Sequence, residues 1–286
     1  MIDFLRYRFV GAFISIAFLG AGVASYVYHG GFRYSVDFTG GTQVRFKFSK
    51  PVGSEAIKEA LASGGWEDAL IREFGSGEVA VRVKEFANDS QGLAQKIKTI
   101  LTVRMSDDNV TILEANAVGA GVGKSLRFGF LMALSLGMLL ILLYIAIRFW
   151  SISYGAGTVL GLIHDALAIG ALIALLQIEV SPNVIMATLA VLGYSVNDTI
   201  VIFAKMRELF KKATNSSAYE VVNLSINQTL RRTILLSFAT MLVVVPLYIY
   251  GGEALHNFSL VFLFGIVVGT YSSIYVASPI MLLLRK

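Results

Sequence analysis

The sequence predicts an α-helical membrane protein with six transmembrane helices and one α+β, ferredoxin-like (βαββαβ) domain outside the membrane. Hydrophobic residues make up 56% of the 286 residues and charged residues only 15%, whereas soluble domains carry about 25% charged residues. Six apolar segments approach the ~20 residues that a ~30 Å hydrocarbon core requires. Between the first two of them, residues 29–127 change their hydrophobic period in a regular order.

The six transmembrane helices are expected at about residues 9–28, 128–149, 155–177, 182–204, 232–250 and 258–284. Arg6 and Arg8 precede the first segment, as basic residues precede the apolar part of a signal peptide. However, this segment is longer than the 7–15 apolar residues typical of signal peptides, and no cleavage pattern follows it. We therefore interpret it as a retained helix. The sixth segment is long enough to tilt.

Lysine and arginine are concentrated at both termini and in the second-to-third and fourth-to-fifth connections, and the loops near 177–181 and 251–257 contain neither. Because basic loops remain in the cytoplasm, both termini are expected to be cytoplasmic. The chain then divides into an N-terminal tail with the first helix (1–28), an exterior domain (29–127) and five further helices (128–286). The basic loops also explain the net charge of +5, so nothing indicates a nucleic-acid partner.

The exterior domain is expected to contain six elements. Its helices and strands alternate as strand 42–48, helix 54–65, strands 69–74 and 78–84, helix 89–105 and strand 109–116, an order typical of ferredoxin-like units. Ser54 can cap the first helix, which Gly64 and Gly65 end, and residues 75–77 form the turn between the two middle strands. Residues 42–116 contain no histidine or cysteine, so we expect this domain to bind or brace and not to catalyse.

Two glycine-rich segments flank this domain. Gly40 and Gly41 precede the first strand, where we expect a tight turn. Residues 117–130 contain the Gly-Lys-Ser of a phosphate-binding loop, but the position five residues before Gly123 is Val118 and not the required glycine. We therefore predict a flexible linker with no nucleotide site. With no cysteine in the chain, disulfides and thiolate metal sites are excluded.

Asp198 lies within an apolar segment, residues 187–203. Ionising a carboxylate in hydrocarbon costs at least ~2.5 to 3.5 kcal/mol, so an acid there is a functional-site candidate. It lies seven residues before the basic cytoplasmic boundary, about 10 Å inside that face. Arg232 begins the fifth helix at a compatible depth, either as a counter-charge or as an anchor that snorkels to the interface. An aspartate that alternates between a cation and an apolar site is a minimal proton carrier.

Two neighbours on the same helix can hydrogen-bond around the Asp198 carboxylate. They are Asn197 and Thr199, although Thr199 can instead bond to its own helix backbone. In the third helix, Asp165 shares a face with small residues and has His164 beside it, about 15 Å deep. This acid and its histidine are either a buried polar pair that holds two helices together or part of the proton path.

Small residues at intervals of four mark two helix-packing faces. They are Gly157 and Gly161 in the third helix and Gly265 and Gly269 in the sixth, and such spacing lets helices approach closely. Residues 218–226, before the fifth helix, are expected to form either a short helix at the cytoplasmic surface or a loop.

Four motifs resemble the SecF family, the smaller membrane subunits of the SecD/SecF protein-export complex. They are VDFTGGTQV at 36–44, GLIHDAL at 161–167, GYSVNDTIVIF at 193–203 and NQTLRRTI at 227–234. The resemblance implies half of an RND-type transporter in the bacterial inner membrane, completed by SecD. It implies that the proton-motive force, with no other cofactor, helps to move unfolded polypeptides through SecYEG, with YajC and YidC as further candidate partners.

The resemblance also implies roles for individual residues. By motif, it assigns proton conduction to Asp198 and Arg232 and a polar motif of less defined role to Asp165 and His164. The family motif at the entry to the exterior domain corresponds to Asp37, Phe38, Gly40 and Gly41. One departure is visible after GYSVNDTIVIF, where the family commonly has Asp-Arg and this chain has Ala204 and Lys205.

Two other functions are compatible with these residues. Half of an RND-type exporter of small molecules or lipids would need a partner or a second copy. An intramembrane aspartyl protease would use Asp165 and Asp198, but neither acid lies in a GxGD motif, and their depths differ by about 5 Å.

Overall fold

The computed structural model describes residues 1–49, 52–73, 77–87, 89–105, 109–149, 151–212 and 217–285. The chain forms two compact units, which we treat separately. One unit comprises Met1–Arg33 with Met132–Lys286, and the other comprises Tyr34–Leu131.

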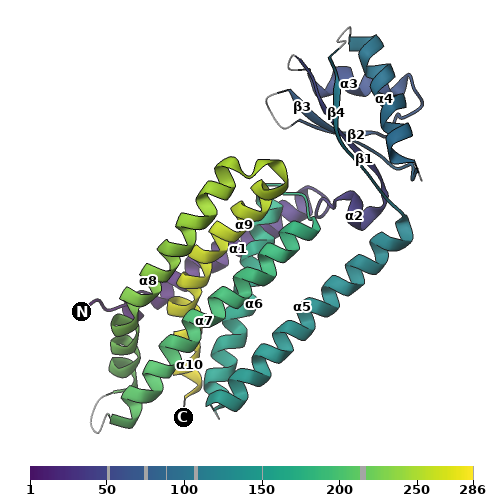
Figure 1. Cartoon of the computed structure of the whole chain (residues 1–286). Helices are drawn as coiled ribbons and strands as arrows, with labels where there is room; N and C mark the ends of the chain where they lie inside the picture. Colours follow the sequence, from purple (N-terminus) through teal and green to yellow (C-terminus); the bar gives the residue numbers. More distant parts are fainter. Residues whose placement is uncertain are drawn as a thin grey trace. The chain divides into compact units, whose positions relative to one another are not determined.

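The first unit is helical (Figure 1). A 3₁₀ turn, Leu5–Tyr7, leads into α1 (Arg8–Tyr28). The later helices are α5 (Ala120–Phe149), of which residues 132–149 belong to this unit, α6 (Ile152–Leu175), α7 (Pro182–Lys212), α8 (Ala218–Tyr250) and α9 (Gly252–Ser272). The last helix continues through a π-helical turn, Ser273–Ala277, into α10 (Ser278–Leu284). Within the described residues, six helical segments are long and apolar enough to cross a membrane. The prediction of a multi-pass membrane protein with six spans is therefore confirmed.

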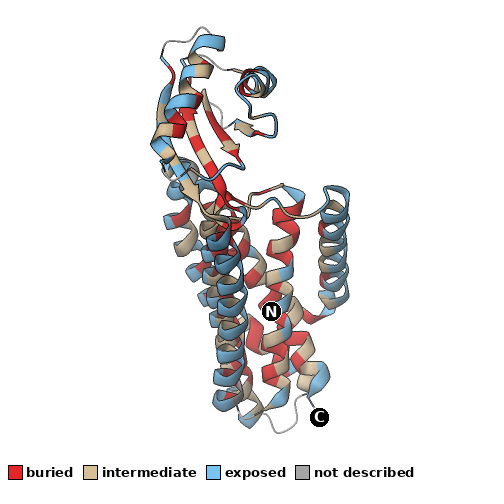
Figure 2. Ribbon diagram, turned by 90° about the vertical axis from the view of Figure 1, so that its right-hand side faces the viewer, coloured by how far each residue is buried: buried red, intermediate tan, exposed pale blue. Residues whose placement is uncertain are grey.

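Burial shows how these helices pack. Buried residues gather on the inner faces of the helices, and exposed residues cover their outer faces (Figure 2). Of the six spanning segments described, α6 is the most buried and α5 the least. Apolar outer faces are compatible with lipid. The exposed leucine and phenylalanine side chains of α5 are therefore suited to contact with lipid and not with water.

Residues 218–226 are neither a separate helix nor a loop; they are the first turns of α8. Ser217 caps the helix, accepting a hydrogen bond from the Glu220 amide while the Glu220 carboxylate accepts one from the Ser217 amide. This capping box satisfies two amides at the helix start. No glycine or proline interrupts the chain between it and Arg232, so the helix continues into the membrane.

The second unit contains the expected ferredoxin-like fold (Figure 1). Its elements are β1 (Gly41–Lys47), α3 (Ser54–Ala62), β2 (Leu70–Glu73), β3 (Glu78–Val83), α4 (Ser90–Met105) and β4 (Thr111–Val118). The sheet order is β2-β3-β1-β4 with antiparallel neighbours. Its core joins Val44, Phe46 and Val81 of the sheet to Ile57 and Ile97 of the helices, and this confirms the fold class.

The N-terminal end of α3 differs from the prediction, and its C-terminal end agrees with it. The N-cap is Gly53, without a side-chain hydrogen bond, and Ser54 is the first helical residue. The Ser54 amide donates to the Glu73 carboxylate of β2 at 2.5 Å, so a neighbouring strand replaces the expected serine cap. The helix ends before Gly64 and Gly65, and the positive φ of Gly65, 92°, suits glycine. Gly75 and Ser76 of the expected turn lie outside the described residues.

The predicted flexible linker at residues 117–130 is wrong. Strand β4 extends to Val118, and α5 begins at Ala120, so Gly121, Gly123 and Gly129 belong to a helix and Gly119 joins it to the strand. A Cβ at Gly123 would lie 2.8 Å from the carbonyl oxygen of Phe38. At this position glycine allows a close approach of helix and backbone, and flexibility is not its role.

Candidate functional site

Asp165 lies at the centre of a hydrogen-bonded cluster that joins three helices. One carboxylate oxygen accepts hydrogen bonds from Ser195 of α7, at 2.5 Å, and from Ser272 of α9, at 2.9 Å. The other oxygen lies 3.1 Å from Nδ1 of His164. The side chain is completely buried, and these three contacts satisfy it as buried polar groups require.

His164 extends this cluster to α1. Its Nε2 lies 2.9 Å from the Ser15 hydroxyl, which lies 2.9 Å from the Tyr271 hydroxyl. Tyr271 in turn donates to the Gly11 carbonyl at 2.5 Å. We call the chain of contacts from Asp165 to Gly11 the Asp165 network. It contains the polar pair expected from the sequence and connects α1, α6, α7 and α9.

Glycines allow these helices to approach. On α6, a Cβ at Gly157 would lie 2.8 Å from the Ala277 carbonyl oxygen, and one at Gly161 would lie 3.3 Å from the Ala277 Cβ. On α9, a Cβ at Gly265 would overlap the Val191 side chain and one at Gly269 would lie 2.8 Å from Ser195, both on α7. The four glycines predicted to form packing faces thus lie at close helix contacts, which position the serines that bind Asp165.

Asp198 is as deeply buried as Asp165, with 1% of the residue exposed, but has fewer partners. Its carboxylate accepts one long hydrogen bond, 3.5 Å, from Thr270 of α9. Thr270 lies 2.9 Å from the Ser237 hydroxyl of α8, which accepts a hydrogen bond from Tyr194 at 3.1 Å. We call these four residues the Asp198 network.

The Thr233 hydroxyl of α8 is buried and without a hydrogen-bond partner. It lies close enough to the Asp198 carboxylate to interact with it, although the geometry does not complete a hydrogen bond. Buried hydroxyls are normally satisfied. Thr233 is therefore a buried donor of α8 that has no hydrogen-bond partner.

Arg232 lies on a different face of α8 from Thr233. It is exposed in this chain, and none of its nitrogens lies within the 4.0 Å of an Asp198 carboxylate oxygen that would define an ion pair. Since successive helical residues point about 100° apart, the inward direction of Thr233 turns the neighbouring Arg232 side chain away from the bundle interior.

The two neighbours of Asp198 do not surround its carboxylate as predicted. Asn197 is exposed and makes no hydrogen bond to Asp198, because the residue before a buried helical position points to another face. The Thr199 hydroxyl donates to the Ser195 carbonyl of its own helix at 3.3 Å, which is the alternative that the sequence left open.

Sequence reasoning missed the hydroxyl groups contributed by α9. Thr270, Tyr271 and Ser272 contact Asp198, Ser15 and Asp165 respectively. They directly precede the π-helical turn, and such turns often occur at functional sites. The run of hydroxyl residues in an apolar segment was the available signal.

The residues that lead into the ferredoxin-like unit form a tight turn. Gly40 and Gly41 have φ of 76° and 115°, and a Cβ at Gly41 would lie 2.5 Å from the Val83 carbonyl oxygen. This confirms the tight turn. Asp37 accepts a hydrogen bond from the Ser35 hydroxyl at 2.9 Å, and Phe38 is buried, so these residues fix the short helix α2 (Val36–Thr39) beside the sheet.

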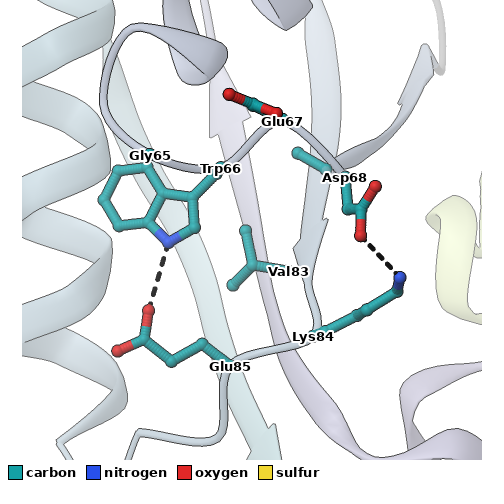
Figure 3. A pocket seen from close by; sticks show the side chains of 8 residues that line it. Gly65, Trp66, Glu67, Asp68, Val83, Lys84 and Glu85 are labelled. Carbon is teal, nitrogen blue, oxygen red and sulfur yellow. Dashed lines mark hydrogen bonds and ion pairs between the residues drawn. The ribbon is translucent and has the colours of Figure 1, made fainter.

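A surface pocket of about 410 Å³ lies in the same unit between residues 65–69 and the end of β3 (Figure 3). Four of its polar side chains form two pairs. Trp66 donates to Glu85 at 3.1 Å, and Lys84 bonds Asp68 at 2.7 Å, which holds the pKa of Asp68 below its usual value. Among the described residues, no group of three acids or histidines could hold a metal ion. This pocket can bind, but it has no nucleophile with a base.

Comparison with known families decides where the chain belongs. The family described as "Protein export membrane protein SecD/SecF, C-terminal" matches residues 96–286, and the "SecD/SecF GG Motif" matches residues 28–52. The protein translocase subunit SecF of Gemmatimonas aurantiaca is 37% identical over 98% of this chain and 86% of its own length. This chain belongs to the SecF family. The resemblance found in the four motifs is therefore confirmed.

Other SecF family members and a solved structure agree. SecF of Escherichia coli O157:H7 is 35% identical over 98% of this chain and 87% of its own length. The crystal structure of SecDF from Thermus thermophilus, described as a translocon-associated membrane protein, matches with a TM-score of 0.88 and 32% identity over 98% of this chain. The chain spans only 38% of the SecDF chain. A super-membrane-facing form of SecDF matches with a TM-score of 0.67.

Proposed function

We propose that this SecF family member uses the proton-motive force, together with SecD, to promote late steps of polypeptide export through SecYEG. Asp198 carries the proposal. It is a buried acid at membrane depth with a single 3.5 Å hydrogen bond. Its ionised form is costly unless a cation or donors approach it, and its protonated form needs neither. Movement of Arg232 or Thr233 relative to α7 would therefore couple proton uptake and release to a shift of helices.

The contrast with Asp165 assigns different roles to the two acids. Asp165 has three contacts, with His164 of its own helix α6, Ser195 of α7 and Ser272 of α9, so its carboxylate joins these helices. We propose that the Asp165 network fixes α6, α7 and α9, and that α8 moves relative to them beside Asp198.

The position of Arg232 supports a partner subunit. At ~1.5 Å per residue, Asp198 lies about 24 Å from the start of α7 and Arg232 about 27 Å from the end of α8, so both reach similar depths. Polar side chains within transmembrane segments usually face protein or water and not lipid. Arg232 and Asn197 are both exposed in this chain. We propose that SecD covers them. SecD would correspond to the part of the SecDF chain that this chain does not span.

The same proposal includes the location of the chain and its orientation in the membrane. Both termini are cytoplasmic in the bacterial inner membrane, and the ferredoxin-like unit lies outside, where it can meet the unfolded exported polypeptide. YajC and YidC are further candidate partners, and the proton gradient is the only energy source that this chain needs.

The arrangement argues against an intramembrane aspartyl protease. Such an enzyme needs two carboxylates close enough to share a proton. Asp165 and Asp198 make no hydrogen bond to each other. They accept hydrogen bonds from different hydroxyls of α9, those of Ser272 and Thr270 respectively. An exporter of small molecules stays an alternative function, and a homo-oligomer that purifies without SecD would favour it.

The test uses inverted membrane vesicles that contain SecD, SecYEG and an exported substrate. Asp198→Asn keeps the size of the side chain but cannot release a proton, so the stimulation of export by the proton gradient should be lost while insertion and SecD pairing persist. A protonophore should reduce the wild type to the level of the variant. Full stimulation in the variant would exclude a proton-carrying role for Asp198.

A further inference from the structure

A second polar cavity lies at the end of the helical unit where α6 begins and α7 and α10 end. Its volume is about 400 Å³. Three cations line it, Arg207 and Lys211 of α7 and Arg285 after α10, together with Ser151, Tyr154 and Phe210. Among its described lining residues there is no acid. The cavity thus combines converging positive charge with an aromatic side.

These cations are not neutralised by carboxylates. Arg207 donates to the Arg148 carbonyl at 3.1 Å, and the Arg285 guanidinium lies 3.2 Å from the centre of the Phe210 ring. No ion pair is formed by Arg207, Lys211 or Arg285 within the described part of the chain. The positive charge that faces the cavity is therefore available to a ligand.

The other basic residues at the end of α7 differ. Lys205 and Lys212 each bond Glu208, at 2.9 and 2.7 Å. A general excess of positive charge on this face of the membrane would not require some basic residues of α7 to be paired with an acid and others to be unpaired. Basic side chains on one side of α7 are compensated, and those on the cavity side are not.

The backbone adds to the same field. Helix α6 begins at Ile152, and its N-cap, Ser151, makes no side-chain hydrogen bond to the first turn. The amides at the start of a helix carry partial positive charge and favour anions. Ser151 lines the cavity, so this end of a 24-residue helix is close to the three cations.

We propose that this cavity binds the phosphate-bearing headgroup of an anionic phospholipid. The cavity lies where spanning helices end, at the level of lipid headgroups, and on the face that we propose to be cytoplasmic. Arginine forks match phosphate oxygens, and basic pockets between transmembrane helices suit anionic headgroups. Phe210 offers an apolar side to the glycerol and upper acyl region. Because the site joins α6, α7 and α10, the lipid would hold the ends of these helices together.

The test measures binding of an acyl-labelled phosphatidylglycerol to the full-length chain in a neutral detergent. Unlabelled phosphatidylglycerol should compete at least tenfold better than phosphatidylcholine. Lys211→Gln and Arg285→Gln, both at exposed positions, should each weaken binding roughly fivefold, the effect of about one basic residue near a membrane surface. Lys205→Gln and Lys212→Gln are matched controls on α7 and should leave binding within twofold.

Each other result overturns the proposal. Equal weakening by all four variants would show a diffuse surface charge, and equal competition by phosphatidylcholine would show that headgroup charge is irrelevant. Glycerol phosphate that competes as well as the lipid would identify a soluble anion as the ligand. An unchanged melting temperature in each variant excludes a folding defect.

Discussion

Ser195 of α7 donates a 2.5 Å hydrogen bond to Asp165 of α6 and lies one helical turn before Asp198. One helix therefore carries both a donor that fixes the first acid and the second acid itself. The Ser195 carbonyl also accepts the Thr199 hydroxyl. A shift of α7 would act on Asp165 and Asp198 together.

Replacing Ser195 tests the Asp165 network. Ser195→Ala removes one of three contacts of a buried acid, so the free energy of unfolding should fall by about 2 kcal/mol. Thr188→Val is the matched control on α7, because Thr188 bonds only its own helix, at the Val184 carbonyl. Thermal unfolding in detergent measures both. Equal stability of the two variants would show that the Ser195 contact contributes little.

Replacing Gly269 tests the close approach of α7 and α9. The new Cβ of Gly269→Ala would lie 2.8 Å from the Ser195 Cβ, so this overpacking should destabilise the protein by about 1 to 3 kcal/mol. Gly193→Ala places its Cβ in open space within this chain and should be neutral or slightly stabilising, because alanine favours helices. A melting temperature for Gly269→Ala that equals the wild-type value would contradict this packing.

Two substitutions of Arg232 distinguish a role in proton coupling from a role in anchoring α8. Arg232→Gln should abolish the stimulation of export by the proton gradient, whereas Arg232→Lys should retain part of it, because lysine keeps the positive charge. Vesicle export with and without a gradient measures this. If Arg232 only anchors α8, the glutamine variant should insert less well and keep its stimulation for each molecule inserted.

Thr270 is the direct donor to Asp198. Thr270→Val keeps the shape of the side chain and removes the hydroxyl, so the gradient-dependent part of export should fall severalfold while insertion is unchanged. Ser273→Ala is the control, since the Ser273 hydroxyl bonds only the Thr270 carbonyl. The same measurement would count against a role for Thr270 if the two variants behaved alike.

Local signals predicted most of the fold. Segment length and hydropathy predict the spans because a bilayer requires ~20 apolar residues in each helix. Alternation and turn residues predict βαββαβ because strand and helix periods differ. The same signals failed at Gly123, since composition alone cannot distinguish a glycine that gives flexibility from one that lies 2.8 Å from the Phe38 carbonyl.

Asp198 was found from the sequence by itself, because a carboxylate in an apolar span is costly wherever the helix packs. Its surroundings were decided only by tertiary structure. Thr270 and Ser237 come from helices distant in sequence, and the rotation of α7 and α8 turns Thr233 inward and leaves Asn197 and Arg232 exposed. Rotation depends on how glycine faces let helices approach, and that is a property of helix pairs which no single segment contains.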